Sequence, residues 1–263
     1  RRKLKTSFIL QPIVTALFSS SPIEKMKISK FISRRAAIWF DVDKDRCGIP
    51  KFIFKNNLGF EDWVDYALKV PMYFVRRNGK YINCAGDSFE KFMDGKLDKF
   101  PDERPTLLDW EDHLSTIFTE IRLKKFIEFR GADTGPWGSL CALPALWVGL
   151  LYDDEALNES ESLANSWTPE MYHKAYSEVP IKGMDLIINN NSIKDYAKEL
   201  IKISKMGLKN RKRLDSSGND ETGYLNQLEE ITYSGKNQAT EMLNIWNNNE
   251  DNGIREIYKR YSY

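Results

Sequence analysis

Hydrophobic and polar positions divide the chain into two parts of different character. From about residue 153 onward, apolar residues recur at helical spacing between short polar loops. This pattern predicts helices over Asp153–Ser166, Pro169–Ser177, Ser192–Leu214, Thr222–Ser234 and Gln238–Asn247. Before residue 150, short apolar and aromatic runs alternate with turn residues. The predicted fold class is therefore α+β, in one continuous domain with a mixed region over 1–150 and a helical region over 151–263 packed on it.

The first half carries several local signals. Asn78-Gly79 separates the runs Pro71–Arg77 and Lys80–Cys84, which predicts a β-hairpin because this dipeptide favours the tightest hairpin turns. The other predicted short elements are a strand at Lys51–Phe54 and helices at Phe60–Leu68, at Ser88–Met93 and after Thr106, where Asp109 completes a capping box.

Two interpretations fit the apolar run Phe8–Phe18, which follows a basic start. A basic segment, an apolar stretch and then serines resemble a secretory signal. The alternative is a buried helix with Gln11-Pro12 at or near its first turn. The run is shorter than the roughly 20 apolar residues that span a bilayer, so we expect no membrane partner. Because the chain begins at Arg1 rather than at methionine, we also expect further residues upstream.

Composition narrows the function classes. The chain has 263 residues, 41% hydrophobic and 29% charged, as in a soluble globular protein. A net charge of +1 gives no reason to expect a nucleic-acid partner. Cys47, Cys84 and Cys141 form neither a metal-binding pair nor a secreted disulfide framework, which favours a reducing, intracellular compartment. His113 lies in a probable helix and is expected to be packed and hydrogen-bonded rather than catalytic.

The alternating acids Asp41, Asp43 and Asp45 are similar to the start of a calcium loop. An EF-hand loop has glycine at its sixth position and a bidentate glutamate at its twelfth. These positions hold Arg46 and Phe52, so we exclude that site. A polar loop beside an active site is the favoured interpretation, and a plain surface loop is the alternative.

The stretch Arg122–Arg130 is predicted to be a strand, in which alternate side chains share one face. One face is largely apolar. The other face carries Arg122, Lys124, Phe126, Glu128 and Arg130. Such a face is either a solvated sheet surface or an anion site. The loop Gly131–Trp137 favours the anion site, because binding residues commonly lie where a loop leaves a rigid strand. Arginines pair with phosphate oxygens, and a glutamate can hold Mg²⁺ against them.

The run IRLKKFIEFRGADTGPW belongs to a longer series of motifs. Before it come LQPIVTALFSSSP, IWFDVDKDRCG, YFVRRNGKYINCAGDSFEKFMDGKL and PTLLDWEDHLSTIF, and after it come LCALPALWVGLLYD and, more loosely, DETGYLNQLEEI. In this order the series resembles the C-terminal portion of plant-type glutamate–cysteine ligases, which also occur in bacteria. The resemblance covers nearly the whole chain.

The resemblance implies a fold, a reaction and a set of ligands. The fold would be related to glutamine synthetase, with part of an antiparallel sheet around the site. The reaction would join the γ-carboxyl of L-glutamate to L-cysteine with ATP, through a γ-glutamyl phosphate, in the first step of glutathione biosynthesis. ATP and Mg²⁺ would be required. The protein would be a monomer or homodimer, located in the cytoplasm of a bacterium or in a plastid.

The resemblance also implies roles for individual residues. Glu128 and Arg130 match an E-x-R strand of this superfamily. Glu128 is thereby a candidate catalytic residue and Mg²⁺ ligand, and Arg130 a candidate catalytic contact to phosphate or acyl phosphate. A structural ion pair of Glu128 with Arg122 or Arg130 is the alternative. Arg35 matches the arginine that this family uses for the glutamate α-carboxylate, with Trp39 either walling that pocket or belonging to the core.

Further substrate-binding candidates come from the same resemblance. Tyr73 matches a tyrosine near the cysteine substrate, the alternative being a core aromatic on the hairpin. Asp133 would orient Arg130 or an incoming amine, and Trp137 would cover the site. Arg122 and Lys124 would face the anionic substrates from the predicted strand.

The chain departs from the family at three points. Plant members carry a second cysteine downstream of Cys84, where this chain has Leu97–Phe100, so that hairpin disulfide should be absent. Thr134 stands where a glycine is usual, and Gly138-Ser139 stand where the family has two arginines. Two alternatives to the ligase remain: a related carboxylate–amine ligase with another acceptor, and a non-catalytic fragment or helical binding module.

Overall fold

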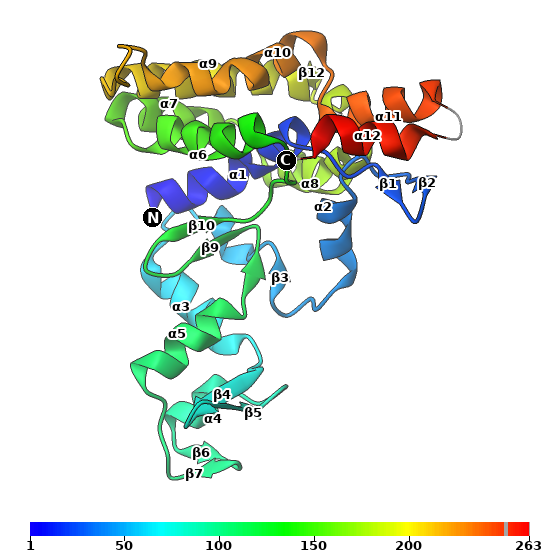
Figure 1. Ribbon diagram of the computed structural model, residues 1–263. Coiled ribbons are helices and arrows are strands. Elements are labelled where there is room, and N and C mark those ends of the chain that lie inside the picture. The colour runs from blue at the N-terminus through cyan, green and yellow to red at the C-terminus, as the bar shows by residue number, and fades with distance from the viewer. Residues whose placement is uncertain (250–251, 263) are drawn as a thin grey trace. The chain divides into compact units, whose positions relative to one another are not determined.

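The computed structural model describes residues 1–249 and 252–262, and these form two compact units. Unit 1 contains Arg1, Lys3–Phe8 and Trp39–Arg130, and unit 2 contains Arg2, Ile9–Ile38 and Gly131–Tyr263. The units interleave along the sequence, whereas the prediction divides the chain after residue 150. The described residues form helices and six two-stranded sheets, which agrees with the α+β class. The elements carry the labels of Figure 1.

Unit 1 combines short strands with short helices. Its elements are η1 (Trp39–Asp41), β3 (Cys47–Gly48), η2 (Lys51–Phe54), α3 (Phe60–Lys69), β4 (Phe74–Arg77), β5 (Lys80–Asn83), α4 (Phe89–Met93), β6 (Lys96–Leu97), β7 (Phe100–Pro101), α5 (Leu107–Ser115), β8 (Phe118–Thr119), β9 (Ile121–Leu123) and β10 (Ile127–Phe129). Two buried apolar clusters hold it together, one around Trp63 and Ile117 and one around Phe89 and Phe92.

Several local predictions for unit 1 are confirmed. The β4–β5 hairpin turns through Asn78 and Gly79, whose φ angles of 51° and 74° are both left-handed, as the Asn-Gly signal requires. Helix α3 covers the predicted Phe60–Leu68 segment, and the Thr106–Asp109 capping box begins α5.

Two strand predictions are wrong. Lys51–Phe54 is a 3₁₀ helix because its three apolar residues after Lys51 bury Ile53 in the core and have no strand partner among the described residues. Arg122–Arg130 is not one strand but the β9–β10 hairpin, whose turn closes where the Lys124 amide donates to the Phe126 carbonyl at 2.9 Å. Arg122 and Glu128 still share a face, but as cross-strand partners.

Unit 2 is predominantly helical. Its elements are α1 (Arg2–Leu17), which also contributes residues to unit 1, β1 (Ile23–Glu24), β2 (Lys27–Ile28), α2 (Arg34–Ile38), α6 (Trp137–Leu151), α7 (Asp154–Asn165), α8 (Pro169–Lys182), η3 (Gly183–Asp185), β11 (Ile187–Ile188), β12 (Asn191–Ser192), α9 (Ile193–Asn210), η4 (Glu221–Leu225), α10 (Asn226–Ser234), α11 (Gln238–Asn248) and α12 (Gly253–Tyr261). The five predicted helices of this region are confirmed, with α9 ending earlier than predicted. No helix of the described residues is long and apolar enough to cross a membrane.

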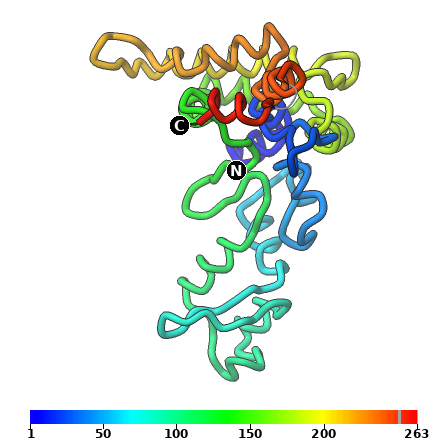
Figure 2. The backbone as a smooth tube through the Cα atoms, turned by 45° about the vertical axis from the view of Figure 1, so that its right-hand side comes forward, coloured from blue at the N-terminus to red at the C-terminus, as the bar shows by residue number. Residues whose placement is uncertain are grey.

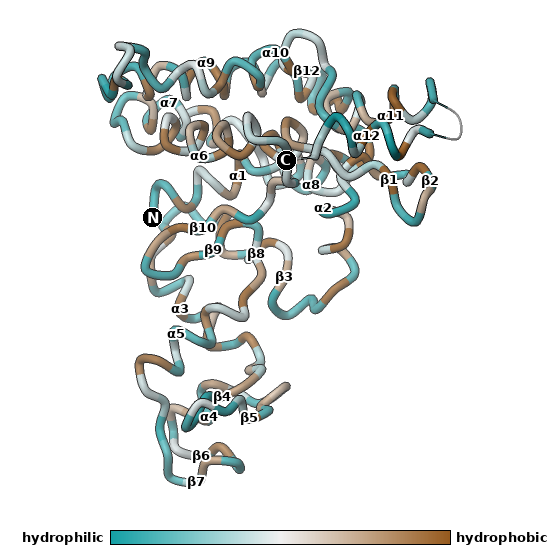
Figure 3. The backbone as a smooth tube through the Cα atoms, viewed as in Figure 1, coloured by the Kyte–Doolittle hydropathy of each residue, from teal (hydrophilic) through white to brown (hydrophobic). Residues whose placement is uncertain are grey.

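The centre of unit 2 is the pair of helices α6 and α9, which lie side by side in Figure 1. Figure 3 shows many apolar residues along α6, and Figure 2 shows the same backbone from another side. The backbones of α6 and α9 approach each other closely because Gly149 of α6 faces Gly207 of α9. A Cβ atom on Gly207 would collide with the Gly149 carbonyl. Ser204 adds a hydrogen bond of 2.9 Å to the Leu146 carbonyl.

Helix α1 confirms the buried-helix interpretation of Phe8–Phe18 but corrects its start. The helix begins at Arg2, so Pro12 lies in its interior rather than in its first turn. Leu4 and Phe8 anchor the preceding turns in the core of unit 1, which explains why the helix extends through the basic segment. The sequence pattern does not predict helices α2, α6 and α12.

Candidate functional site

The β9–β10 hairpin positions a tight arginine–carboxylate group in unit 1. Arg122 donates from Nε and Nη2 to the two oxygens of Glu128 at 2.7–2.9 Å, and from Nη1 to the carbonyls of Ser115 and Ile117 at 2.5 and 2.9 Å. Arg130 Nη1 donates to Glu128 Oε1 at 3.0 Å. The Arg122 side chain is 8% exposed, so its charge is compensated by Glu128 and by these two carbonyls rather than by water. The Glu128–Arg122 ion pair foreseen as the structural alternative is therefore present.

The pKa of Glu128 reflects this environment. Burial on its own raises the pKa of a carboxyl group, but hydrogen bonds and charge from Arg122 and Arg130 outweigh it, so the pKa of Glu128 is lowered. Glu128 is thus ionised at neutral pH and acts as an acceptor.

Aromatic rings connect Arg130 to a second group of unit 1. The Arg130 guanidinium lies 5.9 Å from the Trp39 ring centroid and 5.4 Å from that of Phe118. Phe118 in turn lies 6.0 Å from Trp39 and 6.4 Å from Tyr73. The sequence-predicted residues Trp39, Tyr73, Arg122, Glu128 and Arg130 are therefore brought together, with Phe118 between them.

Tyr73 is held by two residues that the sequence prediction missed. Its hydroxyl donates to Asp43 Oδ2 at 3.0 Å, and the Arg46 guanidinium stacks on its ring at 3.3 Å from the centroid. Arg46, with only 2% of its side chain exposed, also donates to Asp43 at 2.5 Å and to the Pro71 carbonyl at 2.8 Å. Burial and the hydrogen bond to Asp43 raise the pKa of Tyr73, so its phenol stays protonated and keeps its donor role.

The signal for this group was the alternating acid loop after Phe40. The sequence of that loop favours a polar segment beside an active site, but it marks Arg46 only as the residue that stands where a calcium loop needs glycine. Parallel pairing of β3 with β8, which aligns Cys47 with Phe118, places the loop beside Phe118, and no local pattern encodes that pairing.

Lys124 lies apart from these residues. It is at the hairpin turn, where its ammonium is 5.7 Å from the Phe126 ring centroid, and it lines a groove of about 460 Å³ with residues of α5 such as Leu107 and Leu108. Its predicted place on a strand face with Glu128 depended on the single strand that the structure replaces with a hairpin.

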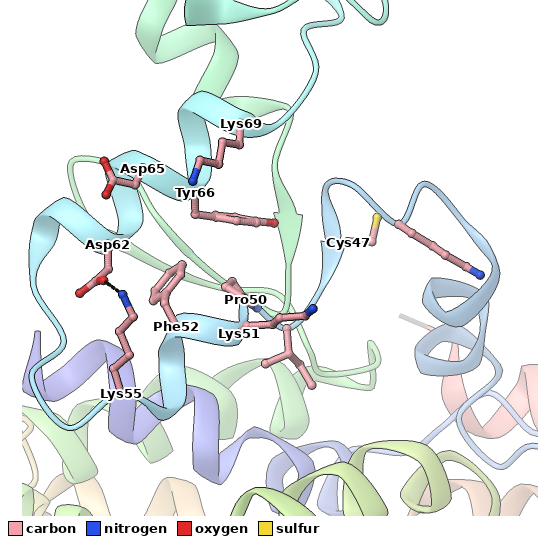
Figure 4. Close-up of a pocket in the computed structure, with 11 residues that line it drawn as sticks. Cys47, Pro50, Lys51, Phe52, Lys55, Asp62, Asp65, Tyr66 and Lys69 are labelled. Carbon is pink, nitrogen blue, oxygen red and sulfur yellow. Dashed lines mark hydrogen bonds and ion pairs between the residues drawn. The ribbon is translucent and has the colours of Figure 1, made fainter.

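A separate pocket of about 570 Å³ in unit 1 is lined by none of the sequence-predicted site residues (Figure 4). Four lysines and two aspartates line it together with apolar side chains: Lys44, Lys51, Lys55, Lys69, Asp62, Asp65, Ile49, Pro50, Phe52, Tyr66 and Cys47. Lys55 Nζ lies 2.5 Å from Asp62 Oδ1, and the two side chains form an ion pair. Burial and the nearby Asp43 raise the pKa of the Cys47 thiol, which therefore is not an activated thiolate.

Three predicted site residues belong to unit 2. Arg35 is the second residue of α2, and its Nη1 atom is buried without a hydrogen-bond partner among the described residues. Asp133 is 6% exposed, and its carboxylate accepts hydrogen bonds from Ser20, Ser21 and Ser33. Trp137, the first residue of α6, is 73% exposed.

His113 is a structural residue, as predicted. Its Nε2 lies 2.8 Å from the Ala67 carbonyl oxygen, and its ring stacks on Phe89 at 4.6 Å. Burial lowers the pKa of His113, which keeps the ring neutral.

The chain is thus a mixed helical and strand protein. Residues 2–260 match the model of a family described as glutamate-cysteine ligase family 2 (GCS2), and the chain belongs to this family.

Similar proteins include glutamate–cysteine ligase B, chloroplastic, of Oryza sativa subsp. japonica, 44% identical over 262 residues. The chloroplastic glutamate–cysteine ligases of Brassica juncea and Arabidopsis thaliana are 44% and 43% identical over the same length. The alignments cover 100% of this chain but 52%, 50% and 49% of these three relatives. The chain thus spans about half the length of the curated relatives it matches.

Proposed function

We propose that the protein containing this chain joins the γ-carboxyl group of L-glutamate to the amine of L-cysteine at the expense of ATP. The γ-carboxylate attacks the terminal phosphorus of ATP and releases ADP; the cysteine amine then displaces phosphate from the γ-glutamyl phosphate and loses a proton as the amide forms. The match over residues 2–260 is the main support. Because the chain spans about half of its relatives, this activity is proposed for the complete protein.

The observation that carries the site assignment is the buried Nη1 of Arg35, which has no hydrogen-bond partner in the part of the chain that the structure describes. A buried donor without an acceptor costs roughly 1–3 kcal/mol, so such an atom is expected to be satisfied by a ligand. A guanidinium matches a carboxylate in shape and charge. We therefore assign Arg35 to the glutamate α-carboxylate.

Arg130 is the better phosphate contact of the two hairpin arginines. Among the described residues its guanidinium makes one hydrogen bond, to Glu128, and therefore keeps free donors, whereas every nitrogen of Arg122 already donates. We propose that Arg130 stabilises the transferred phosphoryl group while Arg122 holds the hairpin. Tyr73 is proposed to contact the cysteine, with its hydroxyl oriented by Asp43.

The metal role of Glu128 has weaker support. Both of its oxygens accept hydrogen bonds from guanidinium groups, and the described residues contain no group of three His, Cys, Asp or Glu side chains that could hold a metal ion. These residues do not fit a magnesium site by themselves, so we derive no step through Mg²⁺. Its assignment as a metal ligand stays a prediction.

The remaining assignments rest on the family alone. We propose that the small strands of unit 1 belong to a larger antiparallel sheet of the glutamine synthetase type. The relatives named above are chloroplastic proteins, which supports a plastid rather than a bacterial cytoplasm. A monomeric or homodimeric state stays a prediction.

The test is ADP release by the protein expressed from its complete reading frame. We expect release that requires both glutamate and cysteine, with γ-glutamylcysteine as the product identified by mass spectrometry. Release supported equally by other amines would favour the related ligase with another acceptor. Absence of release with every amine would contradict the proposal.

A further inference from the structure

Asp133 lies at the centre of a buried hydrogen-bond cluster in unit 2. Its Oδ2 accepts from the Ser21 hydroxyl at 2.6 Å and from the Ser20 amide at 2.9 Å, and its Oδ1 accepts from the Ser33 hydroxyl at 2.7 Å. Asp133 and Ser33 are 6% and 0% exposed. Because this buried carboxylate already accepts three hydrogen bonds from the protein, it is suited to holding other parts of the protein.

The two serine hydroxyls connect this carboxylate to the first turn of α2. Ser33 Oγ accepts from the Ala36 amide at 3.2 Å, and Ser21 Oγ accepts from the Arg35 amide at 3.1 Å. Each hydroxyl has one O–H group, which donates a hydrogen bond to Asp133. Its lone pairs then accept hydrogen bonds from the helix amides. Asp133 therefore fixes the direction of both hydrogen bonds, and through Ser21 it fixes the backbone of Arg35.

The segment that carries the two serines is itself anchored. Ser21 and Ser33 form a parallel bridge, in which the Ser21 amide donates to the Ile32 carbonyl at 3.1 Å. The Ser33 amide donates to the Pro180 carbonyl of α8, also at 3.1 Å. The start of α2 is therefore held from several sides and cannot shift without breaking buried hydrogen bonds.

The two arginines that begin α2 differ in how they are partnered. Arg34 pairs with Glu24 at 2.8 Å on the surface. Arg35 follows directly, yet its buried Nη1 has no acceptor among the described residues. The residue whose amide is fixed by the cluster is thus also the one whose guanidinium still lacks an acceptor.

We propose that Asp133, Ser21 and Ser33 are positioning residues that fix the Arg35 backbone so that its guanidinium meets a carboxylate. This inference rests on the proposed function, in which that carboxylate belongs to glutamate. Asp133 does not touch the substrate. If the cluster had a merely structural role, substitutions in it would change the stability of the protein without raising KM for glutamate selectively over KM for ATP and cysteine.

The first test compares Ser21→Ala with Ser21→Thr in the full-length enzyme. Alanine removes the hydroxyl that links Asp133 to Arg35, whereas threonine keeps it, and the Ser21 site is half-buried. We expect Ser21→Ala to raise KM for glutamate roughly five- to tenfold, the size of one lost hydrogen bond, with KM for ATP and cysteine within twofold of wild type. Ser21→Thr should restore KM for glutamate to within about twofold of wild type.

Ser177→Ala is the matched control, because that exposed hydroxyl donates to the Lys174 carbonyl of its own helix at 3.1 Å. It should leave all three KM values unchanged. An unchanged KM for glutamate in Ser21→Ala, or an equal rise in all three KM values, would overturn the positioning role.

A second test uses Asp133→Asn and measures binding rather than turnover. We expect glutamate to raise the melting temperature of wild type but to need at least tenfold higher concentrations in Asp133→Asn. The same glutamate dependence in both proteins would refute the inference even if the variant melts earlier. Failure of the proposed function would look different: the wild type would release no ADP with glutamate and cysteine, while glutamate-dependent melting would still report on Arg35.

Discussion

Arg122 of unit 1 and Arg35 of unit 2 are both arginines predicted to bind substrate, but the structure surrounds them in opposite ways. Arg122 is bound on every nitrogen, by Glu128 and by two backbone carbonyls, within a β-hairpin that it holds together. Arg35 lies on a five-residue helix whose start is fixed by the Asp133 cluster, and its buried Nη1 has no partner among the described residues.

The difference separates two roles that a sequence motif does not distinguish. A guanidinium whose donors are all satisfied stabilises the fold and has no donor left for a ligand. A guanidinium whose backbone is held by hydrogen bonds and which keeps an unsatisfied donor among the described residues is suited to an anion, because less of the chain has to be ordered when the ligand arrives. We therefore expect substitutions of Arg122 to affect folding and substitutions of Arg35 to affect binding.

The largest expected effect is on stability, in Arg122→Ala. Removing the buried Arg122 side chain leaves two carbonyls without their donor and leaves Glu128 with Arg130 as its remaining partner, which should lower the free energy of unfolding by about 3 kcal/mol. Chemical denaturation followed by circular dichroism measures this free energy of unfolding. Arg76→Ala is the control. The Arg76 side chain is 40% exposed, and its Nε lies 3.6 Å from Asp112 Oδ2, an ion pair that should contribute at most about 1 kcal/mol to the free energy of unfolding. Equal losses in the two variants would remove the assigned structural role of Arg122.

A smaller effect is expected from Glu128→Gln. The amide keeps the shape of the side chain but cannot compensate two guanidinium charges, so Arg130 should be less well oriented toward phosphate. We expect turnover to fall at least tenfold, about 1.4 kcal/mol of activation free energy, with an unchanged circular dichroism spectrum. A coupled ADP assay measures this turnover. If the variant turned over at the wild-type rate, Glu128 would have no role in the site.

The smallest effect concerns His113, a third buried ionisable group and, like Arg122, a structural one. Its pKa is lowered in the folded state, so the unfolded chain binds the extra proton first as pH falls. The free energy of unfolding should therefore decrease below the ordinary histidine pKa of about 6.5, by at most about 1.4 kcal/mol per pH unit. Denaturation at pH 7.5, 6.5 and 5.5 measures this slope. His113→Gln should flatten it, and an identical slope in the variant would contradict the assignment.

Local chemistry made much of the fold predictable. The Asn78-Gly79 turn, the Thr106 cap and the helices of residues 153–247 depend on nearby residues, and all are found. The failures arise where distant packing decides. Lys51–Phe54 has no strand partner among residues 1–249 and 252–262, and the Arg122–Arg130 run contains a turn that its alternating charged residues do not reveal.

The candidate site was predictable only in part, for the same reason. Motif resemblance identified Trp39, Tyr73, Glu128 and Arg130, which the structure brings together in unit 1. It did not identify the residues that orient them. Arg46 reaches Tyr73 through the pairing of β3 with β8. The serines that meet Asp133 lie 100 or more positions away from it in the sequence, and no spacing rule links them.

The most direct test of the account is the KM for glutamate of Arg35→Lys, measured beside Arg34→Lys in the full-length enzyme. Lysine keeps the charge but loses the paired donors of the guanidinium. We predict that Arg35→Lys raises KM for glutamate about 10- to 100-fold, since a charge-assisted hydrogen bond contributes roughly 1.5–3 kcal/mol, while Arg34→Lys stays within about twofold of wild type. Equal KM values for glutamate in the two variants would contradict the assignment of Arg35 to the substrate carboxylate.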